Sequence, residues 1–277
     1  MTDIHATLEF ASLSDTGKVR SSNEDAVALA PQLQLAILAD GMGGYNAGEV
    51  ASGMACALLK NELEQELGTP DAPRPAKPGG TEAPGLHDLL QAAIARTNSA
   101  IYQLAQSQSQ YNGMGTTLVL TIFNGADITV AHLGDSRLYR LRNKLLTQVT
   151  SDHSVLQAQI DAGILTPEQA KLSQNKNLVT RALGIEPEVQ AEIHTWPTEA
   201  GDIYLLCSDG LSDMLDDNAL QTILQNYGHE LQLCANQLIA GANQNGGRDN
   251  VSAILIKVVN LNPVRLSPVA RFLKWLK

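Results

Sequence analysis

Strand-like apolar runs that end beside an acidic residue and a glycine recur along this chain and constrain its fold more than any other feature. A carboxylate at a strand end is held by a rigid sheet yet reaches solvent. A neighbouring glycine lets backbone, metal or phosphate approach closely. The four places are Asp40-Gly41 after LQLAILA, Gly134-Asp135 after ITVAHL, Asp209-Gly210 after IYLLCS, and Asp249 in GGRDN before VSAILIKV.

These four carboxylates predict a site for hard divalent cations. Oxygen ligands without a cluster of histidines or cysteines suit Mg²⁺ or Mn²⁺ rather than Zn²⁺. Several carboxylates that converge on one spot repel one another unless cations lie between them. A single Asp-Gly pair is most often an ordinary turn, but four similar arrangements make a metal site the better interpretation.

Length and composition favour one domain in the cytoplasm. The chain has 277 residues, 44% of them hydrophobic, which suffices for one full core, although the length alone permits two domains. We expect no secretory signal in MTDIHATLEF, and no apolar run approaches the ~18 residues of a membrane span. The three cysteines lack CxxC spacing and are expected to be reduced core thiols. A nucleophilic Cys207 is the alternative, but no cysteine-enzyme motif accompanies it.

The charge balance narrows the possible substrates of a metal site. The net charge is -10, with 29 acidic and 19 basic residues, and so acidic a surface disfavours binding to nucleic-acid backbones. Nuclease and polymerase interpretations are therefore disfavoured. A phosphate ester on a protein needs only a local positive spot, which metals and Arg20 would supply.

The order of predicted elements indicates an α+β fold. Blocks of strands and pairs of helices favour a layered α+β domain over a doubly wound sheet. Strands are expected at 8–14, 26–30, 33–39, 116–123, 127–133, 136–141, 202–208 and 251–258, and helices at 47–67, from about 86 to 104, at 216–227 and at 229–244.

Short polar motifs follow one another from residue 16 to about 256. They are Arg20 with Asn23-Glu24-Asp25, DGMGG at 40–44 with Gly48-Glu49-Val50-Ala51-Ser52, Met114-Gly115-Thr116-Thr117, Gly134-Asp135-Ser136-Arg137, Ser151-Asp152-His153, Cys207-Ser208-Asp209-Gly210 and Gly247-Arg248-Asp249-Asn250. In this order they resemble the metal-dependent PP2C-type (PPM) protein phosphatases of the bacterial branch. The resemblance implies two antiparallel β-sheets packed face to face and flanked by helix pairs, an α-β-β-α sandwich. It also implies hydrolysis of phosphoserine and phosphothreonine.

The resemblance further implies a role for each acidic residue. Asp40 would bridge two Mn²⁺ or Mg²⁺ ions about 4 Å apart. The other expected participants are the Gly41 carbonyl and, through water, Glu24 on one side, Asp209 and Asp249 on the other, Asp25 ordering waters, and Asp135 with Asp209 at a weaker third site. Gly115-Thr116 and Asp152-His153 are assigned to structure.

The implied reaction is direct attack on phosphorus by a metal-bridging hydroxide, without a phosphoenzyme. The guanidinium fork of Arg20 would hold two phosphate oxygens; outside this motif Arg20 would be interpreted as an ordinary surface arginine. Met42 and Tyr45 stand where relatives have a candidate general-acid histidine. We therefore expect a metal-bound water, rather than Tyr45, to protonate the leaving oxygen.

We expect a phosphatase domain at 1–259 that contains an insertion and a flap, followed by a tail. Residues 68–85 are rich in proline and glycine and predict a mobile insertion. Residues 154–184 correspond to a flap beside the active site in relatives. Within it, Ser173-Gln174-Asn175-Lys176-Asn177 differs from the sequence His-Pro-x-Arg-Asn that relatives tend to have. The tail at 260–277 is basic, and Ser267-Pro268 begins an amphipathic pattern. This tail is expected to dock on its own acidic domain, on a membrane surface or on a partner.

Other functions remain open at this stage. The chain is expected to be a monomer that acts on phosphoproteins and opposes a cognate Ser/Thr kinase. A catalytically inactive scaffold is the first alternative, although Arg20, Asp40, Asp209 and Asp249 are all present. A phosphatase for small phosphate esters is the second.

Overall fold

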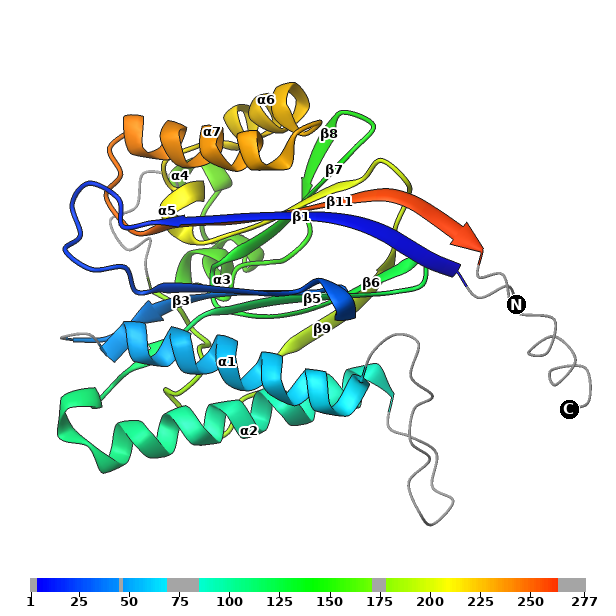
Figure 1. The fold of residues 1–277 in the computed structure, drawn as a ribbon. Coiled ribbons are helices and arrows are strands. Elements are labelled where there is room, and N and C mark those ends of the chain that lie inside the picture. The colour runs from blue at the N-terminus through cyan, green and yellow to red at the C-terminus, as the bar shows by residue number, and fades with distance from the viewer. Residues whose placement is uncertain (1–3, 45–46, 69–84, 171–177, 264–277) are drawn as a thin grey trace, which may run out of the picture.

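Two antiparallel β-sheets lie face to face, and a helix pair covers the outer side of each sheet, as the computed structural model shows (Figure 1). The structure describes residues 4–44, 47–68, 85–170 and 178–263. This α-β-β-α arrangement confirms the predicted fold class.

The first sheet brings the two ends of the described chain together. Its strand order is β1 (Ile4–Asp15), β11 (Val251–Pro263), β10 (Ile203–Cys207), β7 (Arg137–Arg142) and β8 (Leu145–Gln148). β1 and β11 pair along their whole length, from Asp15 opposite Val251 to Ile4 opposite Pro263. The predicted domain boundary at residue 259 is wrong in this respect, because the backbone ladder with β1 continues to Pro263.

The second sheet carries the first of the Asp-Gly pairs. Its order is β2 (Asp25–Ala30), β3 (Leu35–Met42), β5 (Leu118–Asn124), β6 (Asp127–Leu133) and β9 (Glu192–Pro197), and β4 (Gly115–Thr116) pairs with the end of β3. The single strand expected at 116–123 is therefore two strands that pair with successive parts of β3. β8 and β9 were not predicted. Both are short edge strands whose side chains are mostly half-buried or exposed, so they lack an apolar run.

Helices occupy the predicted places. α1 (Ala47–Leu67) and α2 (Leu86–Ser107) cover the second sheet, and α6 (Asp217–Tyr227) and α7 (Leu231–Gln244) cover the first (Figure 1). The shorter helices are α3 (Val155–Asp161), α4 (Pro167–Ala170) and α5 (Asp209–Ser212), and the 3-10 turns are η1 (Pro31–Leu33) and η2 (Ser109–Tyr111). None of the helices in the described ranges has the length and apolarity needed to cross a membrane.

The strand β3 shows how the core holds the site. Leu35 and Ile37 pack in the layer between the sheet and α1 and α2, whereas Ala36 and Leu38 pack between the two sheets. A strand buried on both faces requires a continuous apolar run, and this run is the LQLAILA segment. Because both faces are packed, the strand end that carries Asp40 is fixed from two sides.

Some predictions fall outside the described residues. They concern residues 69–84 of the insertion, residues 171–177 of the flap, residues 264–277 of the tail, and Tyr45. They stay predictions. α3 and α4 occupy part of the flap expected at 154–184.

Candidate active site

The ends of strands from both sheets bring the predicted acidic residues together. Asp40 on β3 lies directly opposite Asp25 on β2. Asp209 begins α5 just after β10, Asp249 lies two residues before β11, and Asp135 lies in the turn from β6 to β7. The two sheets therefore deliver five carboxylates from five separate stretches of sequence.

The raised pKa values of four of these carboxylates indicate that they share one low-dielectric space. Burial raises the pKa of Asp40 well above its usual range, and repulsion from Asp25, Asp209, Asp135 and Asp249 raises it further. Burial, then Asp135 and Asp249, raise the pKa of Asp209 to about 8. Burial also raises the pKa of Asp25 and of Asp135 to about 6. Such a cluster carries a cost in free energy that a bound cation removes.

The donor set fits hard divalent cations. One oxygen of Asp25 accepts a hydrogen bond from the Ser208 hydroxyl (2.8 Å). The other, Oδ1, is buried without a hydrogen-bond partner among the described residues, as expected for an oxygen that faces ions or their waters. Carboxylate oxygens dominate the cluster, which suits Mn²⁺ or Mg²⁺.

Glycine is required beside two of the aspartates. A Cβ atom on Gly41 would lie 2.1 Å from the Gly48 carbonyl oxygen, and one on Gly210 would lie 2.0 Å from the Asn250 carbonyl oxygen. Backbone passes too close at both positions for any side chain. The Asp-Gly pairs therefore hold segments together at the site as well as placing carboxylates.

Arg20 lies in the loop between β1 and β2, at the edge of the acidic cluster. Its Nη2 donates to Asp249 Oδ2 (2.7 Å), and about half of its side chain is exposed. A guanidinium has five N–H donors in a planar fork. Arg20 can therefore bind the oxygens of a substrate phosphate while it remains beside Asp249.

Asn250 joins the loops that carry Arg20, Glu24 and Asp249, and sequence reasoning missed this role. Its Nδ2 donates to the carbonyls of Thr16 (3.0 Å) and Ser22 (2.8 Å), and its Oδ1 accepts from the Glu24 backbone N–H (2.8 Å). Its place directly after Asp249 was the available signal. The motif gives the residue type, but only the fold shows its three partners.

The Thr116-Thr117 pair fixes the backbone of Asp40. The Thr116 hydroxyl and the Thr117 N–H both donate to the Asp40 carbonyl (2.9 Å each), and the Asp40 N–H donates to the Thr117 hydroxyl (3.0 Å). The structural assignment of Thr116 agrees with these contacts. Two side chains and one strand thus hold the residue expected to bridge the metals.

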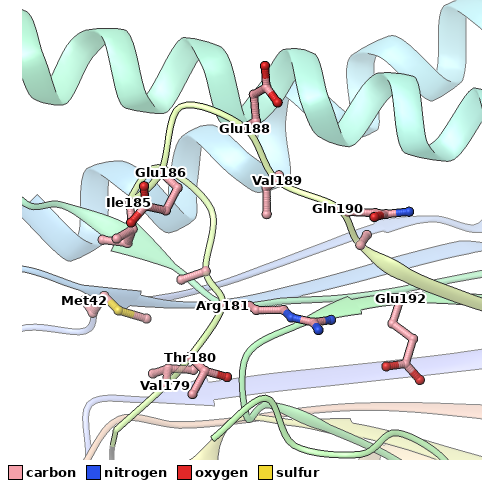
Figure 2. A pocket seen from close by; sticks show the side chains of 12 residues that line it. Met42, Val179, Thr180, Arg181, Ile185, Glu186, Glu188, Val189, Gln190 and Glu192 are labelled. Carbon is pink, nitrogen blue, oxygen red and sulfur yellow. The ribbon is translucent and has the colours of Figure 1, made fainter.

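A hollow of about 680 Å³ lies beside this centre (Figure 2). Met42, two residues after Asp40, forms part of its wall. The remaining lining comes from residues 179–182 of the returning flap segment and from residues 185–192, which lead into β9. The hollow thus separates the active-site end of β3 from the flap segment.

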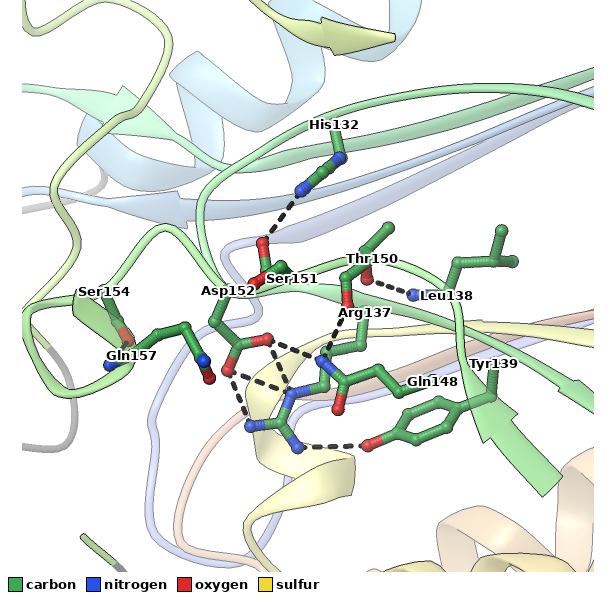
Figure 3. Close-up of polar contacts among 10 residues, drawn as sticks. All are labelled: His132, Arg137, Leu138, Tyr139, Gln148, Thr150, Ser151, Asp152, Ser154 and Gln157. Atoms are coloured by element: carbon green, nitrogen blue, oxygen red, sulfur yellow. Dashed lines mark hydrogen bonds and ion pairs between the residues drawn. The ribbon is translucent and has the colours of Figure 1, made fainter. Parts of the chain in front are cut away.

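An ion pair between Arg137 and Asp152 holds the segment that enters the flap (Figure 3). Arg137 Nε and Nη2 donate to the Asp152 carboxylate (2.9 and 2.7 Å), and Nη1 donates to the Tyr139 hydroxyl (3.0 Å). Nearby, His132 Nε2 lies 2.9 Å from the Ser151 carbonyl. These contacts bear out the structural assignment of Asp152, because they tie residues 151 and 152 to β6 and β7.

His132, His153 and Glu192 form a second cluster with ligand-type atoms, but its geometry does not suit a metal ion. The Gly134 N–H donates to His153 Nδ1 (3.3 Å), so the neutral ring carries its proton on Nε2, which faces Glu192 Oε2 (3.3 Å). The two rings stack 4.6 Å apart at 12°, so their lone pairs lie in separate, nearly parallel planes and do not converge on one point. Burial lowers the pKa of both histidines. The structural assignment of His153 stands.

Cys207 is not a nucleophile. Its side chain is completely buried in the core beneath α5, and burial raises the pKa of its thiol to about 12. A buried thiol of this kind is inert. The three cysteines are all free and buried, as expected.

The fold and the site together define a metal-dependent phosphatase centre, and comparisons with known proteins identify the family. The profile of the Protein phosphatase 2C family matches residues 17–240. The chain therefore belongs to the protein phosphatase 2C family.

Bacterial relatives are similar along most of the chain. Serine/threonine protein phosphatase PstP of Mycobacterium tuberculosis is 38% identical over 269 residues, 97% of this chain, but this chain spans only 48% of PstP. Serine/threonine phosphatase stp of Listeria monocytogenes is 34% identical over 88% of this chain and 93% of its own length.

Solved structures agree with this relationship. The catalytic domain of PstP in complex with two manganese ions is 39% identical and superposes with a TM-score of 0.78 over 91% of this chain and 99% of that chain. Stp1 from Staphylococcus aureus is 31% identical, with a TM-score of 0.81 over 93% of this chain and 98% of its own.

Proposed function

We propose that the chain is a metal-dependent protein phosphatase that hydrolyses phosphoserine and phosphothreonine. The observation that carries the proposal is the convergence of five aspartates beside Arg20, with burial and mutual repulsion raising the pKa of four of them, Asp25, Asp40, Asp135 and Asp209. The similarity to serine/threonine phosphatases across almost the whole stp protein supports the same activity.

In the mechanism, Asp40, Asp209, Asp249 and the Gly41 carbonyl would hold two divalent cations. When bound, such ions supply a nucleophilic water at neutral pH and stabilise negative charge on the phosphate. Arg20 binds and orients the phosphate through its guanidinium fork. Asp25, anchored by Ser208, orders water through its unpartnered oxygen.

We propose Mn²⁺ or Mg²⁺ as the working metal, with Asp135 and Asp209 forming a weaker third site. The repulsion between Asp135 and Asp209 supports the third site. Glu24 lies on the same side as Arg20, and each affects the pKa of the other. Glu24 would thus contact one metal through water.

We further propose that the protein works as a monomer in the cytoplasm, opposes a Ser/Thr kinase, and makes surface or partner contacts through the part of the predicted tail that follows β11, residues 264–277. The three reduced cysteines support a reducing compartment. Liposome flotation of the intact protein and of the tail peptide tests the membrane part; no binding of either to anionic vesicles would leave docking or partner binding.

Hydrolysis of phosphothreonine peptides in Mn²⁺, Mg²⁺ and EDTA tests the proposed function. We expect turnover with either metal, none in EDTA, and nearly complete loss in Asp40→Asn. Small phosphate metabolites serve as competing substrates. Equal or faster hydrolysis of metabolites would favour the small-ester phosphatase, and no turnover of p-nitrophenyl phosphate with Mn²⁺ would favour an inactive scaffold.

A further inference from the structure

One charged side chain extends into the hollow beside the active site and has no role in the mechanism above. Figure 2 shows the Arg181 side chain reaching across this hollow toward the side where Glu192 lies, with Met42 on the opposite side. Val189 lies above it and Thr180 below it. The guanidinium thus lies in a partly apolar hollow, on the side away from Met42 and the end of β3.

The backbone at Arg181 is held in register with the active site. On one side, the Thr180 N–H donates to the His153 carbonyl (2.7 Å). On the other, Leu183 and Thr116 exchange two backbone hydrogen bonds (2.8 and 3.0 Å), and the Thr116 hydroxyl donates to the Asp40 carbonyl (2.9 Å). A short chain of hydrogen bonds therefore fixes Arg181 relative to the residue expected to bridge the metals.

No carboxylate of the described residues lies within ion-pair distance of Arg181, whereas Arg20 and Arg137 each pair with one carboxylate and Arg142 with two. The nearest polar contact is His153 Nε2, 3.5 Å from Arg181 Nη1. That nitrogen carries the ring proton in the tautomer defined by Gly134, so it cannot accept a hydrogen bond. The guanidinium is exposed and keeps its donors for another group.

Three glutamates line the hollow, Glu186, Glu188 and Glu192, and none of them forms an ion pair with Arg181. Glu186 lies beside Ile185, away from the guanidinium (Figure 2). Glu192 is already engaged by His153 (3.3 Å) and His194 (3.0 Å). Glu188 points away from the hollow, toward the helices (Figure 2). A ligand in the hollow would therefore meet the Arg181 fork and the apolar surfaces of Met42 and Val189 first.

We propose that Arg181 binds a second anionic group of the substrate, a carboxylate or a further phosphate, on a residue near the phosphoresidue that is hydrolysed. A guanidinium fork matches the two oxygens of either group, and the apolar wall accommodates the rest of the side chain. This inference rests on the proposed function. It makes the hollow a specificity subsite.

The test compares phosphothreonine peptides that differ at one position. Glutamine is replaced in turn by glutamate, phosphoserine or lysine at each of several flanking positions, and kcat/KM is measured in Mn²⁺ for wild type, Arg181→Gln and Arg181→Lys. Arg96→Gln is the matched control, because Arg96 is also exposed but pairs with Glu62 on the helix pair. p-Nitrophenyl phosphate measures the chemistry alone.

We expect glutamate or phosphoserine at one or two positions to raise kcat/KM about tenfold over glutamine, an advantage that weakens at high salt. Arg181→Gln should remove this advantage and leave the glutamine peptide and p-nitrophenyl phosphate unchanged. Arg181→Lys should keep part of the advantage of the anionic peptide, and Arg96→Gln should keep the whole of it. The glutamate and phosphoserine arms show which anion the subsite prefers.

The opposite results overturn the inference. Hydrolysis with no advantage for an anionic peptide at any position, or an equal loss on all peptides in Arg181→Gln, would remove the subsite while the phosphatase function stands. Failure of the wild type to hydrolyse any phosphopeptide would overturn the proposed function, and the subsite with it.

Discussion

Asp209→Asn should stabilise the metal-free protein while it abolishes metal-dependent activity. In the folded protein, burial and the neighbouring Asp135 and Asp249 raise the pKa of Asp209 to about 8. In the unfolded chain the pKa of an aspartate is about 3.9. At pH 7.5 the folded state therefore bears a charge, or holds a proton, at a cost in free energy that asparagine does not have.

The structure sets the size of this effect. The full pKa difference corresponds to about 5 kcal/mol at pH 7.5. Asp209 is partly exposed at the start of α5, so water screens part of the repulsion. We expect Asp209→Asn to raise the free energy of unfolding by about 2 kcal/mol in EDTA.

Urea denaturation in EDTA and in Mn²⁺ measures the free energy of unfolding of each protein without and with metal. In EDTA the variant should be more stable than the wild type. In Mn²⁺ the order should reverse, because only the wild type gains stability from strong metal binding. Asp127→Asn, an exposed residue at the far end of β6, is the control and should change little in either condition. A variant that is less stable than the wild type in EDTA would refute the repulsion argument.

Three further predictions address the loops, the pH dependence and the third metal. Asn250→Ala should lower the free energy of unfolding by about 3 kcal/mol in urea, since it removes three hydrogen bonds; an effect no larger than that of Asn245→Ala, which removes one exposed bond, would contradict this. Because Asp209 keeps its proton up to about pH 8 only when folded, the metal-free protein should lose stability as the pH rises from about 6.5 to 8. Urea titrations in EDTA check the slope, and a flat or rising profile would be the contrary result. Asp135→Ala should reduce turnover more than phosphate binding, and an unchanged Mn²⁺ titration with unchanged turnover would remove its metal role.

The sequence predicted the elements that are buried and the carboxylates at their ends. The run before Asp40 is apolar because β3 is packed on both faces, so its pattern is strong and its end is well defined. α1 and α2 were likewise visible through their buried stripes. The family resemblance then gave the pairing of the sheets, which periodicity alone does not specify.

The edge strands and the polar contacts were beyond sequence reasoning for a physical reason. β9 is half exposed, and its histidine, glutamate and threonine residues show no apolar alternation. Asn250 contacts residues more than 220 positions away in the chain. Such contacts arise only after the two sheets have closed on each other.

Arg181 illustrates how such long-range placement turns an ordinary residue into a candidate for specificity. In the sequence it belongs to none of the motifs. In the fold, hydrogen bonds from both neighbouring segments place its backbone beside the strand end that carries Asp40. Arg20, Arg137 and Arg142 each pair with a carboxylate of the protein, and Arg181 does not. An arginine that lacks such a partner among the described residues, and that lines a hollow at the active site, is therefore suited to bind an anion that the substrate brings.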